Sequence, residues 1–215
     1  MKHALEQLKS LSLNPRRPVI VTDADEVILH FADILSEYLA SQDMYVNFVS
    51  YALEGNIKYR ATDEPVSSTL FGQLIDDYFE KYVEKQPLVD GAVHHLNRLS
   101  ELCNIVILTN IPHDFADRRR ELFSRKGLPY PMISSSGPKG PALDMLSRMT
   151  DQPLFFIDDI AHHHTSVAKI TPQVQRIQFI ANRHLHSIET KAKDCHHRCE
   201  DWAEIERVIR ETLLT

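Results

Sequence analysis

Residues able to handle phosphate and metal ions follow four separate apolar runs. Asp23 and Asp25 follow the run Val19–Thr22, and Thr109 and Asn110 stand at the end of the run 104–109. Lys139 lies in the Gly/Pro-rich loop after the run 130–134, and Asp158 and Asp159 follow Leu154-Phe-Phe-Ile157. A carboxylate cluster repels a phosphate dianion unless a cation is present, and hard cations such as Mg²⁺ prefer oxygen ligands. If the fold brings these four ends together, the residues predict a site for a phosphate group and Mg²⁺.

The four acidic residues are candidate metal ligands. Asp23 and Asp159 offer carboxylates, Asp25 can add its backbone carbonyl, and Asp158 is expected to assist from the same site. Two adjacent acids directly after a buried apolar strand are costly unless they are paired or bind a metal. We therefore prefer the metal-binding interpretation to a helix cap or a turn.

The remaining polar residues suit the phosphate and the proton transfers. The hydroxyl of Thr109 and its neighbour Asn110 can bind the non-bridging oxygens, and Lys139 can balance their charge as a compact cation. Asp25, two residues after Asp23, can protonate a leaving alcohol and later take a proton from water. Thr109, Lys139 and both of these aspartates are thus the catalytic candidates.

These residues must be positioned by alternating strands and helices. Compact apolar runs typical of buried strands lie at 19–22, 104–109, 130–134, 154–158 and 176–180. Helical spacing of apolar residues covers 2–12, 92–102, 115–123, 142–149, 166–170 and 202–214. This alternation predicts an α/β fold with a doubly wound parallel sheet, in which ligands gather at the carboxyl ends of the strands.

One segment does not alternate. From about residue 31 to 86 there is no convincing buried strand, and helical, aromatic-rich stretches cover 31–39, 44–53 and 69–83. We interpret it as a helical insertion between the first two strands of the sheet. Lys58 and Arg60, in the loop of this insertion, either project toward a substrate or form an exposed basic loop.

The four motifs together resemble the haloacid dehalogenase-like superfamily of phosphohydrolases. The matching stretches are Val-Ile-Val-Thr-Asp23-Ala-Asp25, Ile-Leu-Thr109-Asn110, Gly-Pro-Lys139-Gly and Phe-Phe-Ile-Asp158-Asp159. The resemblance covers most of the chain, and the helical insertion lies where that family carries its type-one cap. It implies that Asp23 is the nucleophile and that Mg²⁺ is the cofactor.

The resemblance also implies an architecture and a reaction. The architecture is a Rossmann-like core of residues 1–30 and 88–215, with sheet order 5-4-1-2-3 and a helical cap at 31–87. The reaction is hydrolysis of a small phosphate monoester through an aspartyl-phosphate. A phosphotransferase or mutase on this scaffold and a non-catalytic regulatory protein remain alternatives. A haloacid dehalogenase is disfavoured, because it would need neither Asp25 nor Asp159.

Two stretches depart from the family pattern. Glu26 stands where the family usually has glycine, and we expect it to add bulk and negative charge near the entrance of the site. His162, His163 and His164 follow the last motif, and we interpret them as the exposed first turn of a helix rather than as ligands. Cys195 and Cys199, with nearby histidines, lack the usual spacing of a structural zinc site.

Composition excludes several other classes. The chain has 215 residues, a net charge of -6 and 43% hydrophobic residues, so neither nucleic acid nor an anionic membrane is an expected partner. No apolar run has the length of a membrane span, and charges interrupt the N-terminus too early for a signal peptide. Three cysteines do not suggest a disulfide framework, so a reducing, cytoplasmic setting is expected.

Overall fold

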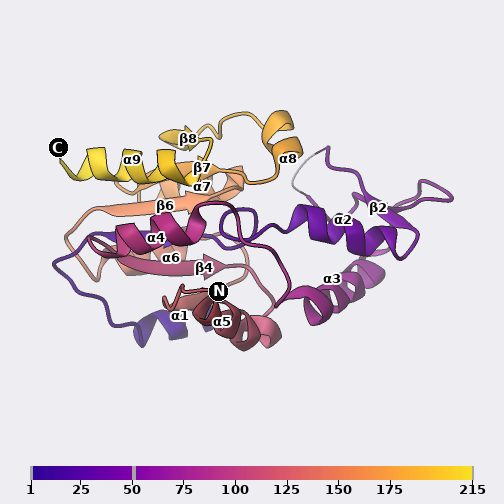
Figure 1. The fold of residues 1–215 in the computed structure, drawn as a ribbon, viewed down its shortest axis with the longest axis horizontal. Coiled ribbons are helices and arrows are strands. Elements are labelled where there is room, and N and C mark those ends of the chain that lie inside the picture. The colour runs from indigo at the N-terminus through magenta and orange to yellow at the C-terminus, as the bar shows by residue number, and fades with distance from the viewer. Residues whose placement is uncertain (1, 50–51, 215) are drawn as a thin grey trace.

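A six-stranded parallel sheet forms the centre of the computed structural model, which describes residues 2–49 and 52–214 (Figure 1). The strands are β1 (Val19–Thr22), β4 (Asn104–Thr109), β5 (Met132–Ser134), β6 (Leu154–Asp158), β7 (Gln175–Phe179) and β8 (His197–Cys199). Their order is β5-β4-β1-β6-β7-β8, and every neighbouring pair is parallel. The predicted order of five strands is therefore confirmed, with β8 added at one edge.

Both faces of the sheet are buried, which explains why the central strands β1, β4 and β6 are almost continuously apolar. Side chains alternate between two clusters: Ile20 belongs to the cluster shared with α4 (Ala92–Ser100), α5 (Ala116–Arg125) and α9 (Trp202–Leu213). Val19 and Val21 belong to the cluster shared with α1 (Lys2–Lys9), α6 (Gly140–Ser147) and α7 (Ala161–Ile170). Helices on both faces make this the doubly wound fold that the alternation predicts.

Between β1 and α4 the chain forms a projection beside the sheet (Figure 1). It contains α2 (Ala32–Ala40), β2 (Met44–Val46), β3 (Ile57–Tyr59) and α3 (Ser68–Tyr82). The two helices match the prediction, but the predicted helix over 44–53 is wrong. Met44–Val46 pairs instead with Ile57–Tyr59 as an antiparallel two-stranded sheet, so the insertion is not entirely helical.

Aromatic side chains hold the two helices of the insertion together. The ring of Tyr78 lies 5.1 Å from Phe31 and 5.6 Å from Tyr82, and Tyr38 lies 5.9 Å from Tyr82. Tyr78 and Tyr38 are buried. These ring contacts therefore form an aromatic core between the two helices.

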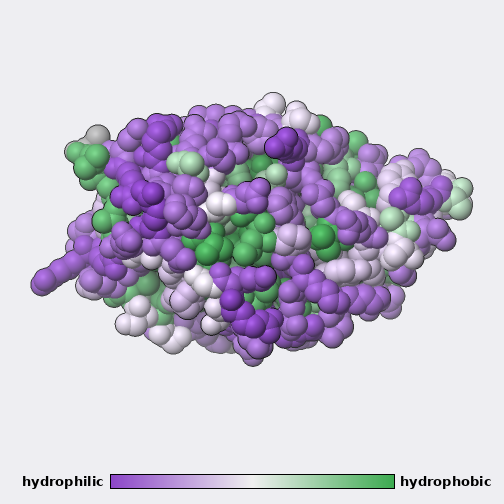
Figure 2. Space-filling model, in the orientation of Figure 1, coloured by the Kyte–Doolittle hydropathy of each residue, from purple (hydrophilic) through white to green (hydrophobic). Residues whose placement is uncertain are grey.

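The remaining elements are short. A 3₁₀ turn, η1 (His113–Phe115), leads into α5, and α8 (Arg183–Ile188) follows β7. Neither α8 nor β8 was expected from the residue pattern. No helix within residues 2–49 and 52–214 has the length and apolar character needed to cross a bilayer. Hydrophilic residues cover most of the face in Figure 2, and apolar residues show between them in small patches.

Candidate functional site

The predicted site residues converge at the carboxyl ends of the parallel strands. β1 lies between β4 and β6, so Asp23, Thr109 and the Asp158–Asp159 pair follow three adjacent strands. Asp23, Asp158 and Asp159 are all buried, and one carboxylate oxygen from each lies within 4.8 Å of the others. The strand order alone therefore assembles three acids from distant parts of the sequence.

Lys139 lies against this acidic cluster although it belongs to a different loop. Its Nζ is 2.6 Å from Oδ2 of Asp158 and 2.8 Å from Oδ1 of Asp23, and the side chain is fully buried. The next residue, Gly140, starts α6 where that helix touches α7. A Cβ atom at Gly140 would lie only 2.5 Å from the carbonyl oxygen of Ser166, so glycine permits the approach that places Lys139.

The charges of this cluster do not balance. Burial raises the pKa of Asp23 to about 7, and Lys139 only partly opposes that effect. Burial raises the pKa of Asp159 well above its ordinary value, and the charges of Asp158 and Asp23 raise it further. For Asp158 burial also acts upward, but Lys139 together with His163 and His164 outweighs it, and the pKa falls. One ammonium group thus faces three carboxyl groups.

A divalent cation fits the imbalance and the available atoms. Oδ1 of Asp159 is buried, and no described residue donates a hydrogen bond to it. Buried carboxylate oxygens without a donor are costly, and Mg²⁺ binds such oxygens. Asp23, Asp158 and Asp159 together therefore have the chemistry and the spacing to hold Mg²⁺.

Thr109 lies across from the acidic cluster at the end of β4. Its hydroxyl is buried and has no hydrogen-bond partner among the described residues, so it is free to bind an oxygen atom of a ligand. The neighbouring Asn110 is exposed, and its Nδ2 donates to the carbonyl of Gly137 at 3.1 Å. Asn110 consequently ties the end of β4 to the loop that precedes Lys139.

Asp25 is held by two residues that the sequence did not reveal. Its Oδ1 accepts hydrogen bonds from Nη1 of Arg119 at 3.1 Å and from Nε2 of Gln86 at 2.9 Å. Arg119 also donates to Oε1 of Gln86, and its guanidinium is 5.9 Å from the ring centres of Phe79 and Phe123. Asp25 is thereby connected to both α5 and the end of the insertion.

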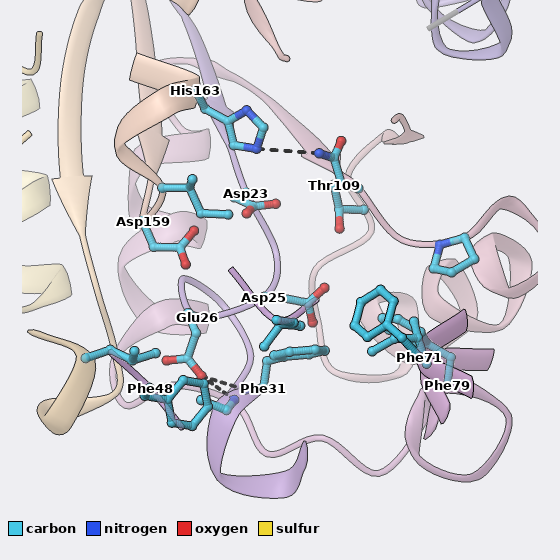
Figure 3. Close-up of a pocket in the computed structure, with 17 residues that line it drawn as sticks. Asp23, Asp25, Glu26, Phe31, Phe48, Phe71, Phe79, Thr109, Asp159 and His163 are labelled. Carbon is cyan, nitrogen blue, oxygen red and sulfur yellow. Dashed lines mark hydrogen bonds between the residues drawn. The ribbon is translucent and has the colours of Figure 1, made fainter. Parts of the chain in front are cut away.

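Asp23, Asp25, Thr109 and Asp159 line a cavity of about 260 Å³ between the carboxyl ends of the strands and the insertion. Figure 3 shows Asp23, Asp159 and Thr109 on one side of it, and Phe31, Phe48, Phe71 and Phe79 toward the other. Asp25 and Glu26 lie between the two groups in this view. The cavity therefore has a polar end formed by strand ends and an apolar end formed by the insertion.

Similar architectures occur among solved structures at low sequence identity. A haloacid dehalogenase-like protein of unknown function from Agrobacterium tumefaciens aligns with a TM-score of 0.64 and 16% identity, covering 91% of this chain and 98% of that chain. A haloacid dehalogenase family hydrolase from Deinococcus radiodurans, with bound phosphate and sodium, gives 0.60 and 12%, covering 94% and 98%. The chain has the haloacid dehalogenase-like fold. Searches of protein-family models and of curated proteins find no match.

At the turn where members of the haloacid dehalogenase-like superfamily usually have glycine, Glu26 has a left-handed backbone with φ of 60°. Its carboxylate accepts hydrogen bonds from the backbone N–H groups of Phe31, Ala32 and Asn182 at 2.9, 2.6 and 2.8 Å. A left-handed non-glycine residue costs about 1–2 kcal/mol, which charge-assisted hydrogen bonds can offset. Glu26 is thus 3% exposed and joins α2 to the loop after β7, instead of simply adding bulk at an entrance.

The interpretation of the three histidines is partly wrong. His162 is exposed, but His163 and His164 are buried, and His163 lines the cavity. Nε2 of His163 lies 3.5 Å from Nδ2 of Asn110, and burial lowers the pKa of His163 to about 3. His163 is therefore a neutral polar group beside the acidic cluster of this haloacid dehalogenase-like fold.

Arg119 and His163 belong to the site although the sequence analysis did not assign them to it, and both have a weak signal in the sequence. Ala116, Arg119 and Phe123 recur at helical spacing on the buried face of α5, so Arg119 occupies a position that is otherwise apolar. His163 likewise precedes the buried Val167 by one helical turn. A polar residue on the apolar face of a helix is a candidate for a buried partner, whereas Gln86 has no comparable signal.

Other candidate groups do not gather at the site. Lys58 pairs with Asp63 at 3.2 Å, and the guanidinium of Arg60 lies 6.0 Å from the ring centre of Tyr45. Cys195 and Cys199 are buried free cysteines. Within the part of the chain that the structure describes, only the three aspartates form a group of metal-binding spacing.

Proposed function

We propose that the protein is a magnesium-dependent phosphohydrolase that cleaves a small phosphate monoester through a phosphorylated Asp23. The observation that carries this proposal is the buried cluster of Asp23, Asp158 and Asp159, opposed by the single ammonium of Lys139. Such a cluster needs another cation, and a phosphate dianion adjacent to it needs the same cation. In this proposal residues 1–30 and 88–215 form the catalytic core, and residues 31–87 form the cap.

The first half of the proposed reaction transfers the phosphoryl group to the protein. A carboxylate oxygen of Asp23 attacks phosphorus in line with the ester oxygen, so a new P–O bond forms as the bond to the leaving alcohol breaks. When bound, Mg²⁺ supplies positive charge to the phosphate oxygens and aligns the phosphorus for this attack. The Thr109 hydroxyl and Lys139 stabilise the remaining oxygens, and Asn110 holds the loop that carries Lys139.

The second half returns the protein to its starting state. In the first half Asp25 gives its proton to the alcohol as that alcohol leaves, and in the second half it accepts a proton from the water that attacks the phosphorus on Asp23. Breaking the aspartyl–phosphorus linkage releases inorganic phosphate and restores both carboxyl groups. Both hydrogen bonds from Arg119 and Gln86 go to Oδ1 of Asp25, which leaves Oδ2 for the proton transfers.

The test uses acetyl phosphate and benzyl phosphate with Mg²⁺ or with a chelator, followed by phosphate release. Wild type should turn over at least one of them only with Mg²⁺, and Asp23→Asn should lose at least a thousandfold in kcat. Asp151→Asn is the matched control, because Asp151 is exposed just before β6, at the opposite end of that strand. Equal activity of wild type and Asp23→Asn on both compounds would remove the basis of the proposal.

Asp25→Asn tests the covalent step separately. Acetyl phosphate has a good leaving group that needs little help from an acid, whereas water attack still needs a base. The variant should therefore accumulate phosphorylated protein, detectable by intact-protein mass spectrometry and mapped to Asp23. Rapid turnover by Asp25→Asn without any accumulation would contradict the assigned acid–base role.

The three buried free cysteines fit the reducing cytoplasmic setting that we expect for this activity.

A further inference from the structure

The apolar end of the cavity has a composition that restricts the leaving group. Its wall is formed by side chains of the insertion and its flanks: Phe31, Phe48, Leu53, Phe71, Ile75 and Phe79. Phe31 and Phe79 are fixed by rings behind them, because Tyr78 lies 5.1 Å from Phe31 and 5.3 Å from Phe79. A largely preformed aromatic wall favours an apolar or aromatic group in contact with it.

The cavity offers no cation to a second anionic group. Among the described residues that line it, the charged side chains are carboxylates, namely Asp23, Asp25, Glu26 and Asp159, and no lysine or arginine is present. Lys139 contacts the acidic cluster but is already paired with two carboxylates. An additional carboxylate or phosphate on the substrate would therefore meet an apolar wall and like charges.

The basic residues of the insertion are occupied elsewhere. Lys58 pairs with Asp63, and Arg60 lies over the ring of Tyr45. Lys81 lies 5.2 Å from the ring centre of Tyr38, and Lys85 lies 5.6 Å from that of Tyr82. None of these four basic residues lines the cavity. The described insertion thus provides ring surface to the leaving group and no compensating positive charge.

The size of the cavity sets the scale of the ligand. A cavity of about 150 Å³ is sufficient for benzene. The space here is about 260 Å³, which leaves room for a phosphate group at the polar end and one ring at the apolar end. A nucleotide or a long chain would exceed this space unless the insertion moved away.

On the basis of the proposed phosphohydrolase function, we propose that the cavity selects phosphate monoesters of uncharged, ring-sized apolar alcohols and rejects those with a second anionic group. Placing an unpaired carboxylate against the aromatic wall carries a desolvation cost that no described lining residue repays. A loss of at least tenfold in kcat/KM is expected for each added carboxylate, within the range by which apolar pockets discriminate.

The experiment compares benzyl phosphate with its para-carboxylated counterpart, 4-carboxybenzyl phosphate, using the full chain and Mg²⁺. Wild type should favour benzyl phosphate at least tenfold in kcat/KM. Phe71→Arg adds a cation to the wall, so it should reduce or invert the preference. Leu102→Arg adds the same charge at a residue that is 43% exposed and outside the cavity, and it should leave the preference unchanged.

Acetyl phosphate separates failure of this inference from failure of the proposed function. Acetyl phosphate is too small to test the aromatic wall, so its magnesium-dependent hydrolysis reports on the aspartate chemistry alone. If it is hydrolysed and 4-carboxybenzyl phosphate is used as well as benzyl phosphate, the inferred selectivity is wrong while the function stands.

Binding provides a readout that needs no turnover. With Mg²⁺ present, calorimetry should show benzylphosphonate binding to wild type at least tenfold more tightly than 4-carboxybenzylphosphonate. Equal affinities, tighter binding of the carboxylated compound, or no binding of either would overturn the inference. Circular dichroism of Phe71→Arg checks that its altered preference does not reflect unfolding.

Discussion

Replacing Asp23 by asparagine should make the metal-free protein more stable, and the gain should grow with pH. Burial raises the pKa of Asp23 from 3.8 to about 7, so the folded carboxyl group holds its proton more tightly than the unfolded one. Stability from this group is fully present below about pH 4 and is lost as the pH rises toward 7. Asparagine cannot ionise, so the variant escapes that loss.

The expected magnitude follows from the shift of the pKa. One pKa unit corresponds to about 1.4 kcal/mol, so the raised pKa of Asp23 lowers the free energy of unfolding, relative to its value at low pH, by roughly 2 kcal/mol at pH 5 and roughly 4 kcal/mol at pH 8. Asparagine also loses the ion pair with Lys139, but Lys139 keeps its contact with Asp158 at 2.6 Å. The difference in stabilisation between the two pH values, about 2–3 kcal/mol, is therefore the quantity to measure.

Urea unfolding in the presence of a chelator, followed by circular dichroism at both pH values, provides the measurement. Asp151→Asn is the control, because this exposed aspartate lies at the other end of β6. Adding Mg²⁺ at pH 8 should stabilise wild type more than Asp23→Asn, since the ion binds the ionised carboxylate. A variant that is less stable than wild type at both pH values, or a gain that is the same at both, refutes the electrostatic reasoning.

Three further substitutions test the contacts around the site by urea unfolding with Mg²⁺. Glu26→Gln places an NH₂ group against a backbone N–H donor and should lower the free energy of unfolding by about 2–3 kcal/mol. An unchanged midpoint of urea unfolding would show that the three hydrogen bonds contribute little. Arg119→Met leaves the carboxylate of Asp25 without its cation, and because Asp25 is partly exposed we expect a loss of about 2 kcal/mol. Stability equal to wild type would contradict a structural role for this pair. Trp202→Phe removes the hydrogen bond from Nε1 to the carbonyl of Val27, at 3.0 Å, and should cost about 1–2 kcal/mol; no loss would mean that another group replaces the donor.

The sheet and the acidic cluster could be predicted because their signals are local. Each strand of the site is a short apolar run, and each run ends in residues that would be costly to bury without a partner. The strand order then places Asp23, Thr109 and Asp159 side by side at the carboxyl ends of three adjacent strands, so knowing the order is enough to bring them together. Their catalytic roles remain predictions.

Other features depend on partners that the local pattern does not contain. Met44–Val46 is a strand because it pairs with Ile57–Tyr59, and a stretch of three residues is too short for its hydrophobic periodicity to predict that pairing. Arg119 can be buried because two residues distant in sequence bind its guanidinium: Asp25 pairs with its charge, and the Oε1 of Gln86 accepts a hydrogen bond from it. Glu26 departs visibly from the expected glycine, but its three backbone donors include the N–H of Asn182, which only the folded structure brings near.

The order of the strands has a consequence for how the chain acquires its site during synthesis. β1 occupies the middle of the sheet, yet both of its neighbours and the loop carrying Lys139 are made much later than Asp23. Asp158 and Asp159 emerge from the ribosome well over a hundred residues after Asp23, so a shorter nascent chain has no complete acidic cluster. The proposed Mg²⁺ site is therefore complete only in chains that have grown past β6, so the ion would act on the late steps of folding rather than on the first.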